Sequence, residues 1–197
     1  MIRANLARIS NEVGPKVTIV VATKYVHAAE MAALADAGVE VVGENRLQDL
    51  VAKQNAVGDR FRWHFIGHLQ SRKARDVSER CELVHSLDSI SAARRLSAPA
   101  LVEVNLAAEE TKSGIVPDDL AAFLAEAREL HIDVRGLTTM PPLTDDPEGS
   151  RPYFRKLREL ATDHGLGELS MGTSQDYRVA AEEGATFVRV GSTLFGR

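Results

Sequence analysis

The chain has 197 residues, of which 44% are hydrophobic and 26% charged, a composition typical of one globular domain with a packed core. Asp and Glu number 28 against 24 Lys and Arg, and the net charge of −4 argues against a nucleic-acid-binding protein with a broad basic face. The single cysteine, Cys81, excludes a disulfide framework and a multi-cysteine metal cluster. The apolar runs are too short to cross a bilayer and residues 1–13 lack the apolar segment of a signal peptide, so we expect a cytoplasmic protein with no membrane association.

Short runs rich in β-branched residues alternate along the chain with segments of helical spacing. The predicted strands are residues 17–22, 39–42, 62–66, 83–86, 100–105, 132–138, 168–170 and 186–190. Predicted helices follow the first seven strands, over about 27–37, 47–54, from 69 onward, 90–96, after Pro117, 149–164 and 174–183. This alternation predicts a parallel sheet with crossover helices.

The helix missing after the eighth strand has a substitute at the N-terminus. Ile2, Leu6, Ile9 and Val13 form one apolar stripe, so residues 2–13 predict a helix that closes the ring beside the last strand. The count favours a single α/β domain over residues 1–197, a closed (β/α)8 barrel of the TIM type, over an open doubly wound sheet. Such barrels typically have about 250 residues, whereas this chain has 197. A barrel of this length therefore requires short loops between its strands and helices.

Polar and glycine residues follow the predicted strands at the end where such barrels carry their chemistry. They are Lys24, residues 43–45, 67–68, Ser86, Asn105, 139–140, 171–174 and 191–192. A lysine facing a barrel mouth loses solvation and becomes a Schiff-base nucleophile, whereas its position alone favours an ordinary surface lysine at a strand end. Both interpretations of Lys24 stay open at this point.

Two glycine- and hydroxyl-rich loops follow the seventh and eighth strands. Residues 170–174 and 189–193 fit the phosphate site that recurs at these strands, although Gly and Ser are also ordinary turn residues. Arg189 stands in an otherwise apolar strand and requires a partner.

Other polar residues carry weaker indications. His64 and His68 straddle a strand end and a loop, so we expect structural roles for them and predict no metal site. Arg72, Lys73 and Arg75 predict a solvated basic helix face, and Cys81 predicts a buried or incidental thiol.

Taken in order, these segments resemble the YggS/PROSC family of pyridoxal phosphate homeostasis proteins. The matching stretches are VATK (21–24), GEN (43–45), WHFIGHLQS (63–71), KSG (112–114), RGL (135–137), LSMGTS (169–174) with Asp176, VRVGS (188–192) and FG (195–196). WHFIGHLQS and the LSMG stretch are the most specific. Thr138 and Thr173 stand where the family usually has methionine.

The resemblance implies a barrel like the N-terminal domain of alanine racemase and pyridoxal 5'-phosphate (PLP) as cofactor. It implies that Lys24 carries PLP as an aldimine and that Ser174, Gly191 and Ser192 hold the phosphate. It further implies that Arg189 faces the pyridine nitrogen and that Asn45 and Met171 line the ring.

An arginine opposite the pyridine nitrogen disfavours the pyridinium form, so carbanions on the cofactor are stabilised weakly. A racemase also needs a second acid/base on the opposite face of its substrate. Alanine racemases take that group from a second domain, whereas the barrel here accounts for the whole chain. We therefore hypothesise a PLP-binding protein that acts in vitamin B6 and amino-acid homeostasis without efficient catalysis.

Three alternatives stay open. The first is a low-activity PLP-dependent amino-acid racemase, and the second a Schiff-base lyase that uses Lys24 directly on a carbonyl substrate. The third is an interaction module that contacts PLP-dependent apo-enzymes through Arg72, Lys73 and Arg75.

Overall fold

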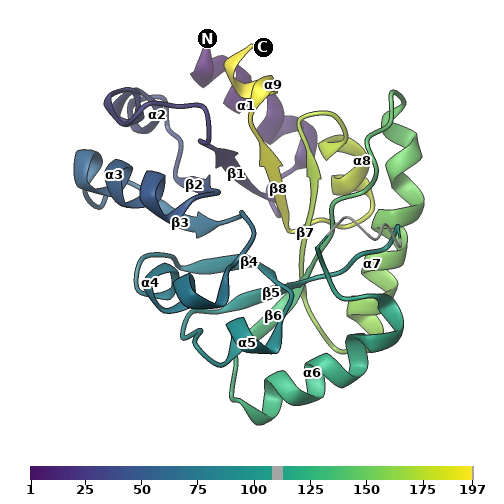
Figure 1. Ribbon diagram of the computed structural model, residues 1–197. Coiled ribbons are helices and arrows are strands. Elements are labelled where there is room, and N and C mark those ends of the chain that lie inside the picture. The colour runs from purple at the N-terminus through teal and green to yellow at the C-terminus, as the bar shows by residue number, and fades with distance from the viewer. Residues whose placement is uncertain (108–112, 197) are drawn as a thin grey trace.

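The computed structural model describes residues 1–107 and 113–196 and forms a closed parallel barrel (Figure 1). The strands are β1 (Thr18–Ala22), β2 (Val41–Glu44), β3 (Arg62–Phe65), β4 (Leu83–Leu87), β5 (Ala100–Glu103), β6 (Val134–Thr138), β7 (Glu168–Thr173) and β8 (Phe187–Val190). Each strand pairs with the next in the chain, and β8 pairs with β1. The predicted barrel and all eight predicted strands are confirmed, with ends that differ by up to three residues. Lys112 of the KSG stretch lies outside the described residues.

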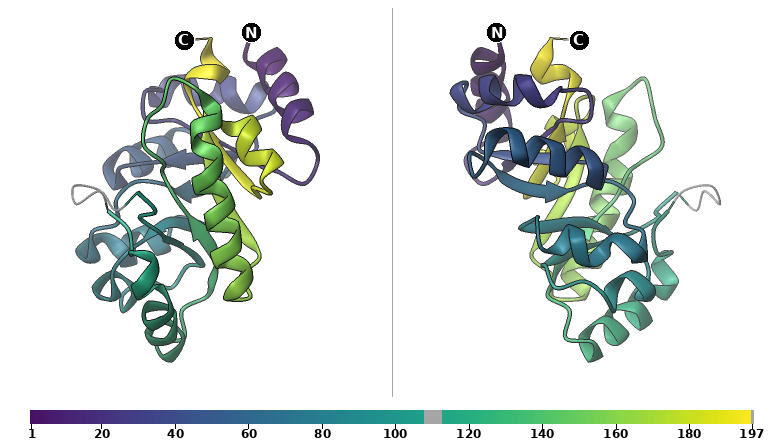
Figure 2. Two further views of the ribbon diagram at one scale, coloured as in Figure 1. Left: turned by 90° about the vertical axis from the view of Figure 1, so that its right-hand side faces the viewer. Right: turned by 60° about the vertical axis from the view of Figure 1, so that its left-hand side comes forward.

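Helices cover the outside of the barrel (Figure 2). They are α1 (Ile2–Val13), α2 (Met31–Asp36), α3 (Leu47–Val57), α4 (Ala74–Ser78), α5 (Ile90–Ala93), α6 (Leu120–Glu129), α7 (Arg151–Asp163), α8 (Tyr177–Glu182) and α9 (Ser192–Phe195), with short 3₁₀ turns η1 (Ala28–Glu30), η2 (Ser71–Lys73), η3 (Pro117–Asp119) and η4 (Pro147–Ser150). The helix predicted from residue 174 begins only at Tyr177, because Asp176 accepts the Thr173 N–H and holds the preceding residues in a turn. The short helix α9 was not predicted.

The N-terminal helix closes the ring as the apolar stripe predicts. Ile9 and Val13 of α1 are buried, and α1 packs on α8 and α9. Asn5 Nδ2 donates to the carbonyl of Leu194, 3.0 Å away. The two ends of the chain therefore lie side by side beyond β8 (Figures 1 and 2).

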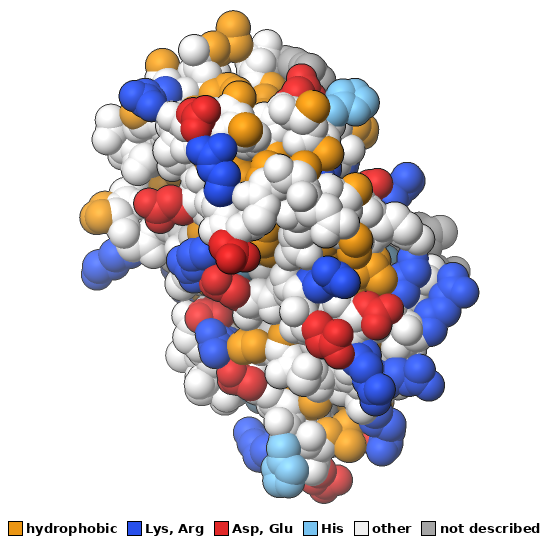
Figure 3. Space-filling model, turned by 90° about the vertical axis from the view of Figure 1, so that its left-hand side faces the viewer, with side chains coloured by type: hydrophobic (Ala, Val, Ile, Leu, Met, Phe, Trp, Pro, Cys, Tyr) orange, Lys and Arg blue, Asp and Glu red, His pale blue; other side chains and the backbone are white. Residues whose placement is uncertain are grey.

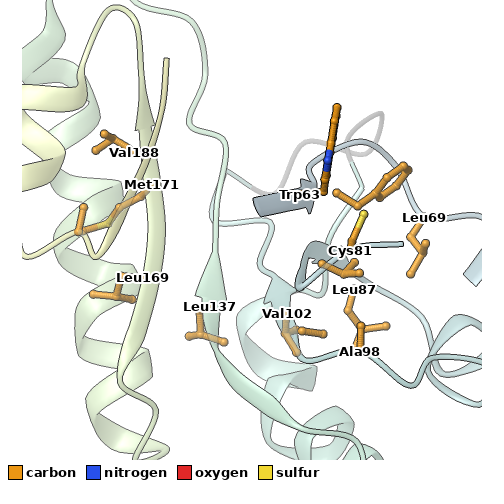
Figure 4. Packing of buried hydrophobic residues seen from close by; sticks show 14 of the residues in the cluster. Trp63, Leu69, Cys81, Leu87, Ala98, Val102, Leu137, Leu169, Met171 and Val188 are labelled. Carbon is orange, nitrogen blue, oxygen red and sulfur yellow. The ribbon is translucent and has the colours of Figure 1, made fainter. Parts of the chain in front are cut away.

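The apolar core lies between the barrel and its helices. Figure 4 shows part of it, with Leu137, Met171 and Val188 on the strands. Cys81 belongs to this core, and burial raises the pKa of its thiol to about 12, which confirms the predicted buried thiol. Within the described residues, no helix combines the length and apolar character that a membrane span requires.

Candidate functional site

A cavity of about 790 Å³ opens at the C-terminal end of the barrel. The sequence predicted seven cofactor-binding residues, and six of them line this one cavity: Lys24, Asn45, Ser174, Arg189, Gly191 and Ser192. They come from the ends of β1, β2, β7 and β8, which lie far apart in the chain and meet only because the barrel closes. The cavity therefore brings an amine, an amide, a guanidinium and several hydroxyls together.

Met171 is the exception among the seven residues. It is fully buried in the apolar core and does not line the cavity. Side chains alternate along a strand, and because Ser170 of β7 points into the barrel, Met171 points out toward the helices. Met140, in the loop after β6, lines the cavity instead.

Lys24 lies two residues beyond the end of β1 and is exposed at the cavity. Its Nζ lies 4.8 Å from the centre of the Tyr25 ring, a cation–π contact. Within the described part of the chain, no carboxylate forms an ion pair with it. The amine is thus free to meet a ligand in the cavity.

A buried ion pair lies directly behind Lys24. Glu44 is fully buried, and its Oε2 accepts hydrogen bonds from Lys53 Nζ and from Thr23 Oγ1, the latter at 2.9 Å. Its Oε1 accepts the main-chain N–H of Asn45 at 2.8 Å. Lys53 Nζ also donates to the carbonyl of Thr23 at 2.7 Å. One ion pair therefore fixes the backbone next to both Lys24 and Asn45.

Sequence reasoning missed this pair. Glu44 is a charged residue at the end of an apolar strand, and the argument that a buried charge requires a partner, applied to Arg189, applies equally here. Nothing in the sequence indicates that Lys53, on α3, is that partner.

Asn45 lines the cavity and carries a buried side-chain oxygen. Among the described residues, this Oδ1 has no hydrogen-bond partner. Gly67 holds its backbone in place, since a Cβ at Gly67 would lie only 2.1 Å from the main-chain oxygen of Asn45. Only glycine permits this approach, so the GEN and IGH stretches depend on each other.

The loops after β7 and β8 are joined through Ser174. Its Oγ accepts the main-chain N–H groups of Gly191 and Thr193, at 3.0 and 3.3 Å, and the Thr193 hydroxyl donates back to the Ser174 carbonyl at 2.9 Å. Gly172 has a φ of +88°, and a Cβ there would lie 2.5 Å from Ala180 Cβ. Thr193 is a site residue that the resemblance did not supply, although it stands in the stretch singled out as glycine- and hydroxyl-rich.

Arg189 finds its partners among neutral groups. Its Nη1 donates to Ser170 Oγ, to the Ser170 carbonyl at 2.9 Å and to Thr138 Oγ1 at 2.8 Å, while Nη2 donates to the carbonyl of Thr139 at 3.0 Å. Burial lowers the pKa of its guanidinium to about 10, so it stays charged at neutral pH. Among the described residues, no hydrogen bond of Arg189 uses Nε, so the Nε–H is a donor available for a ligand.

The two histidines of the sequence analysis, His64 and His68, lie apart from the cavity lining. His64 is buried and bonded to His85, whereas His68 is exposed and lies 3.5 Å from Asp88. Within the described residues, no group of three or more His, Cys, Asp or Glu is arranged to hold a metal ion.

The predicted basic cluster lies on η2 and α4, with Arg72 and Arg75 exposed. Figure 3 shows the side of the molecule that carries α2, α3 and α4, on which basic and acidic side chains are interspersed.

The family follows from comparison with known proteins. A family model described as the N-terminal domain of alanine racemase matches residues 1–197. The pyridoxal phosphate homeostasis protein of Aquifex aeolicus is 43% identical over 176 residues, which cover 81% of this chain and 77% of that protein. This chain belongs to the YggS/PROSC family of pyridoxal phosphate homeostasis proteins.

Solved structures agree with that assignment. PipY of Synechococcus elongatus, with PLP bound, is 34% identical, covers 100% of both chains and has a TM-score of 0.90. Alanine racemase of Corynebacterium glutamicum, 16% identical, matches with a TM-score of 0.77 over 98% of this chain and 60% of that one, which shows a shared barrel fold. The resemblance stated from the sequence motifs is confirmed.

Proposed function

We propose that this homeostasis protein binds PLP reversibly, holds it covalently on Lys24 and takes part in intracellular vitamin B6 and amino-acid homeostasis without efficient catalysis. The observation that carries the proposal is the convergence of six chemically suited residues on one cavity. PipY, a relative of 34% identity over its full length, has a structure with PLP bound. We take residues 1–197 as one PLP-binding domain that acts in the cytoplasm.

The chemistry of the cavity fits this cofactor. Its volume of about 790 Å³ lies in the range of small-molecule sites. Among the described residues, the buried Oδ1 of Asn45 has no partner and requires a donor, which a hydroxyl of the cofactor ring would supply. The hydroxyls and main-chain N–H groups of the loops after β7 and β8 suit a phosphate, the anion that such loops bind in barrels of this type.

Lys24 supplies the covalent anchor. Its Nζ would hold the cofactor through a C=N bond to the aldehyde carbon that the cofactor would supply, with loss of water. The Tyr25 ring holds the Lys24 amine by its cation–π contact, and the Lys53–Glu44 pair fixes the backbone that carries the lysine.

Two other groups orient the ligand in the cavity. Ser174, Gly191 and Ser192 would hold the phosphate end. Arg189 would face the pyridine nitrogen at the other end. Because the guanidinium stays charged, it opposes protonation of that nitrogen and leaves the ring a poor electron sink.

The positions of the tyrosines support binding over racemisation. Tyr25 follows Lys24 directly, and its ring lies against the same amine, not on an opposing face. Tyr177 is engaged outside the barrel, where its hydroxyl donates to Glu12. Tyr153 lies on α7 and does not line the cavity. For contact with PLP-dependent apo-enzymes we propose the basic face formed by Arg72, Lys73 and Arg75 on η2 and α4.

The proposal is tested by titrating the ligand-free protein with PLP while recording visible absorption. We expect a saturable new band and, for the loaded protein with a free amino acid in D₂O, no steady deuterium incorporation at the α-carbon. Absence of a saturable band contradicts PLP binding. Steady incorporation contradicts the non-catalytic role and favours a racemase.

A further inference from the structure

A chain of hydrogen bonds crosses the polar interior of the barrel and ends on Arg189. His64 Nδ1 lies 2.9 Å from His85 Nε2, and His85 Nδ1 lies 2.8 Å from Ser170 Oγ, which accepts a hydrogen bond from Arg189 Nη1. These residues come from β3, β4, β7 and β8, and each is less than a tenth exposed. Buried polar groups destabilise a protein unless they are fully paired. It therefore matters which atom donates the proton in each of these hydrogen bonds.

The direction follows from the donor at its end. A guanidinium can only donate, so Ser170 Oγ is an acceptor toward Arg189. The one hydroxyl proton of Ser170 is then free to donate to Nδ1 of His85. In neutral His85 the other nitrogen, Nε2, carries the hydrogen and donates to Nδ1 of His64.

The opposite order leaves a proton without an acceptor. If His85 carried its hydrogen on Nδ1, Ser170 Oγ would accept from both neighbours. Within the described residues, no other acceptor is within hydrogen-bond reach of the Ser170 hydroxyl. A buried hydroxyl proton without an acceptor is energetically unfavourable, which decides the order.

Charge and packing support the same arrangement. Burial lowers the pKa of His64 to about 4 and that of His85 well below 6.5, so both rings are neutral near pH 7. The Phe187 ring lies edge-on to both, with ring centres 5.7 and 5.4 Å away, and holds their planes. In this arrangement the Ser170 oxygen presents a lone pair to the guanidinium, which adds to the favourable coulombic interaction of the buried cation with Glu103 and Asp176.

We propose that His85 and Ser170 are positioning residues for the charged Arg189, and that His64 and His85 are both neutral with hydrogen on Nε2. These hydrogen bonds hold Nη1 inside the barrel, next to Thr138 Oγ1, in a side chain that lines the cavity. Its effect on the cofactor rests on the proposed function. The proton order itself is a property of the ligand-free protein.

The first experiment therefore needs no cofactor. Long-range ¹H–¹⁵N spectra of the imidazoles in ligand-free protein near pH 7 report which ring nitrogen carries hydrogen. We expect the Nε2–H tautomer for both His64 and His85. The Nδ1–H tautomer, or a protonated ring, at either residue overturns the proposal.

The second experiment follows the Arg189 Nε–Hε resonance in variants of the ligand-free protein. His85→Phe removes both hydrogen-bonding nitrogens, whereas His85→Gln keeps an acceptor for Ser170 and a donor for His64. We expect the resonance to shift or broaden in His85→Phe and to return toward its wild-type position in His85→Gln. Phe187→Leu is the packing control and should leave the tautomers unchanged. An unmoved Arg189 resonance in His85→Phe contradicts the positioning role.

Ser170→Ala provides a second test in case His85→Phe does not fold. It deletes only the hydroxyl that links Arg189 to the two histidines. It should move the Arg189 resonance in the same direction and raise the Kd for PLP about tenfold, the loss of one charge-assisted hydrogen bond. Wild-type protein that binds no PLP would refute the proposed function, while the tautomers would still decide the proton order. An unchanged Kd and resonance in Ser170→Ala overturn the positioning role.

Discussion

Lys53 Nζ donates a 2.7 Å hydrogen bond to the main-chain carbonyl of Thr23, the residue before Lys24. Lys53 and its partner Glu44 are buried, and the carboxylate of Glu44 also binds the backbone of Asn45. The two cavity residues thus take their positions from one charge pair.

We predict that Lys53→Met lowers the free energy of unfolding by about 3–5 kcal/mol, because it leaves the Glu44 carboxylate buried without its cation. Urea unfolding measures this loss. Glu44→Gln added to Lys53→Met should restore part of it. Glu82→Gln breaks the exposed Arg62–Glu82 pair and should cost less than about 1 kcal/mol. Equal costs at the two pairs would contradict the structural role assigned to Lys53.

Ser174→Ala should weaken PLP binding about tenfold, because the hydroxyl that holds Gly191 and Thr193 in place is lost from the phosphate end. Absorption titration gives the Kd. Pyridoxal, which has no phosphate, should bind the variant and the wild type equally. Ser91→Ala on α5, outside the cavity lining, is the matched control. A Ser174→Ala variant with wild-type affinity for PLP would remove Ser174 from the phosphate site.

The buried His64 predicts a loss of stability in acid. Burial lowers its pKa from 6.5 to about 4 in the folded protein, so the unfolded chain binds a proton in this range that the folded chain does not. Stability is therefore fully present above pH 6.5 and falls as pH decreases toward 4, by up to about 1.4 kcal/mol per pH unit for this group.

Other groups titrate in the same range, since burial raises the pKa of Asp88 and Glu103, so the test is a difference between proteins. Urea unfolding of wild type and His64→Phe across this range should show a shallower acid loss in the variant. Parallel pH profiles would show that His64 takes up its proton equally in both states.

The Cys81 thiol should resist modification in the native protein. Burial raises its pKa to about 12, so little thiolate forms at mild alkaline pH. A chromogenic disulfide reagent should react slowly with native protein and rapidly after urea unfolding. Rapid reaction of the native thiol would mean that the core around β3 and β4 opens readily.

Lys24→Ala should abolish covalent PLP retention and leave the barrel folded, because Lys24 is exposed and lies outside the core. Thermal melts of the ligand-free variant and wild type should differ by no more than a few degrees. Lys16→Ala, another exposed lysine, should retain PLP. A large loss of thermal stability in Lys24→Ala would instead assign this lysine a structural role.

The sequence predicted the barrel because its pattern is local. Each strand is a β-branched run, and the stripe from Ile2 to Val13 marks the closing helix. The family resemblance assigned Met171 to the cofactor ring, and the predicted strand ended at Ser170. The real strand continues to Thr173, and its alternation turns Met171 toward the helices.

The pairings that complete the site could not be predicted. His85 and Ser170 are 85 residues apart and meet across the barrel interior, and Glu44 meets Lys53 only after α3 packs on β2. Such contacts depend on how the closed barrel packs, and no spacing in the sequence specifies them.

Borohydride reduction of the PLP-loaded protein, followed by peptide mass mapping, tests the central claim most directly. Reduction makes the lysine–cofactor bond permanent, so the modified peptide identifies the anchor. We predict one reduced adduct, on Lys24. An adduct on another lysine, or none in protein that has been exposed to saturating PLP, would contradict the assignment of Lys24 as the covalent anchor.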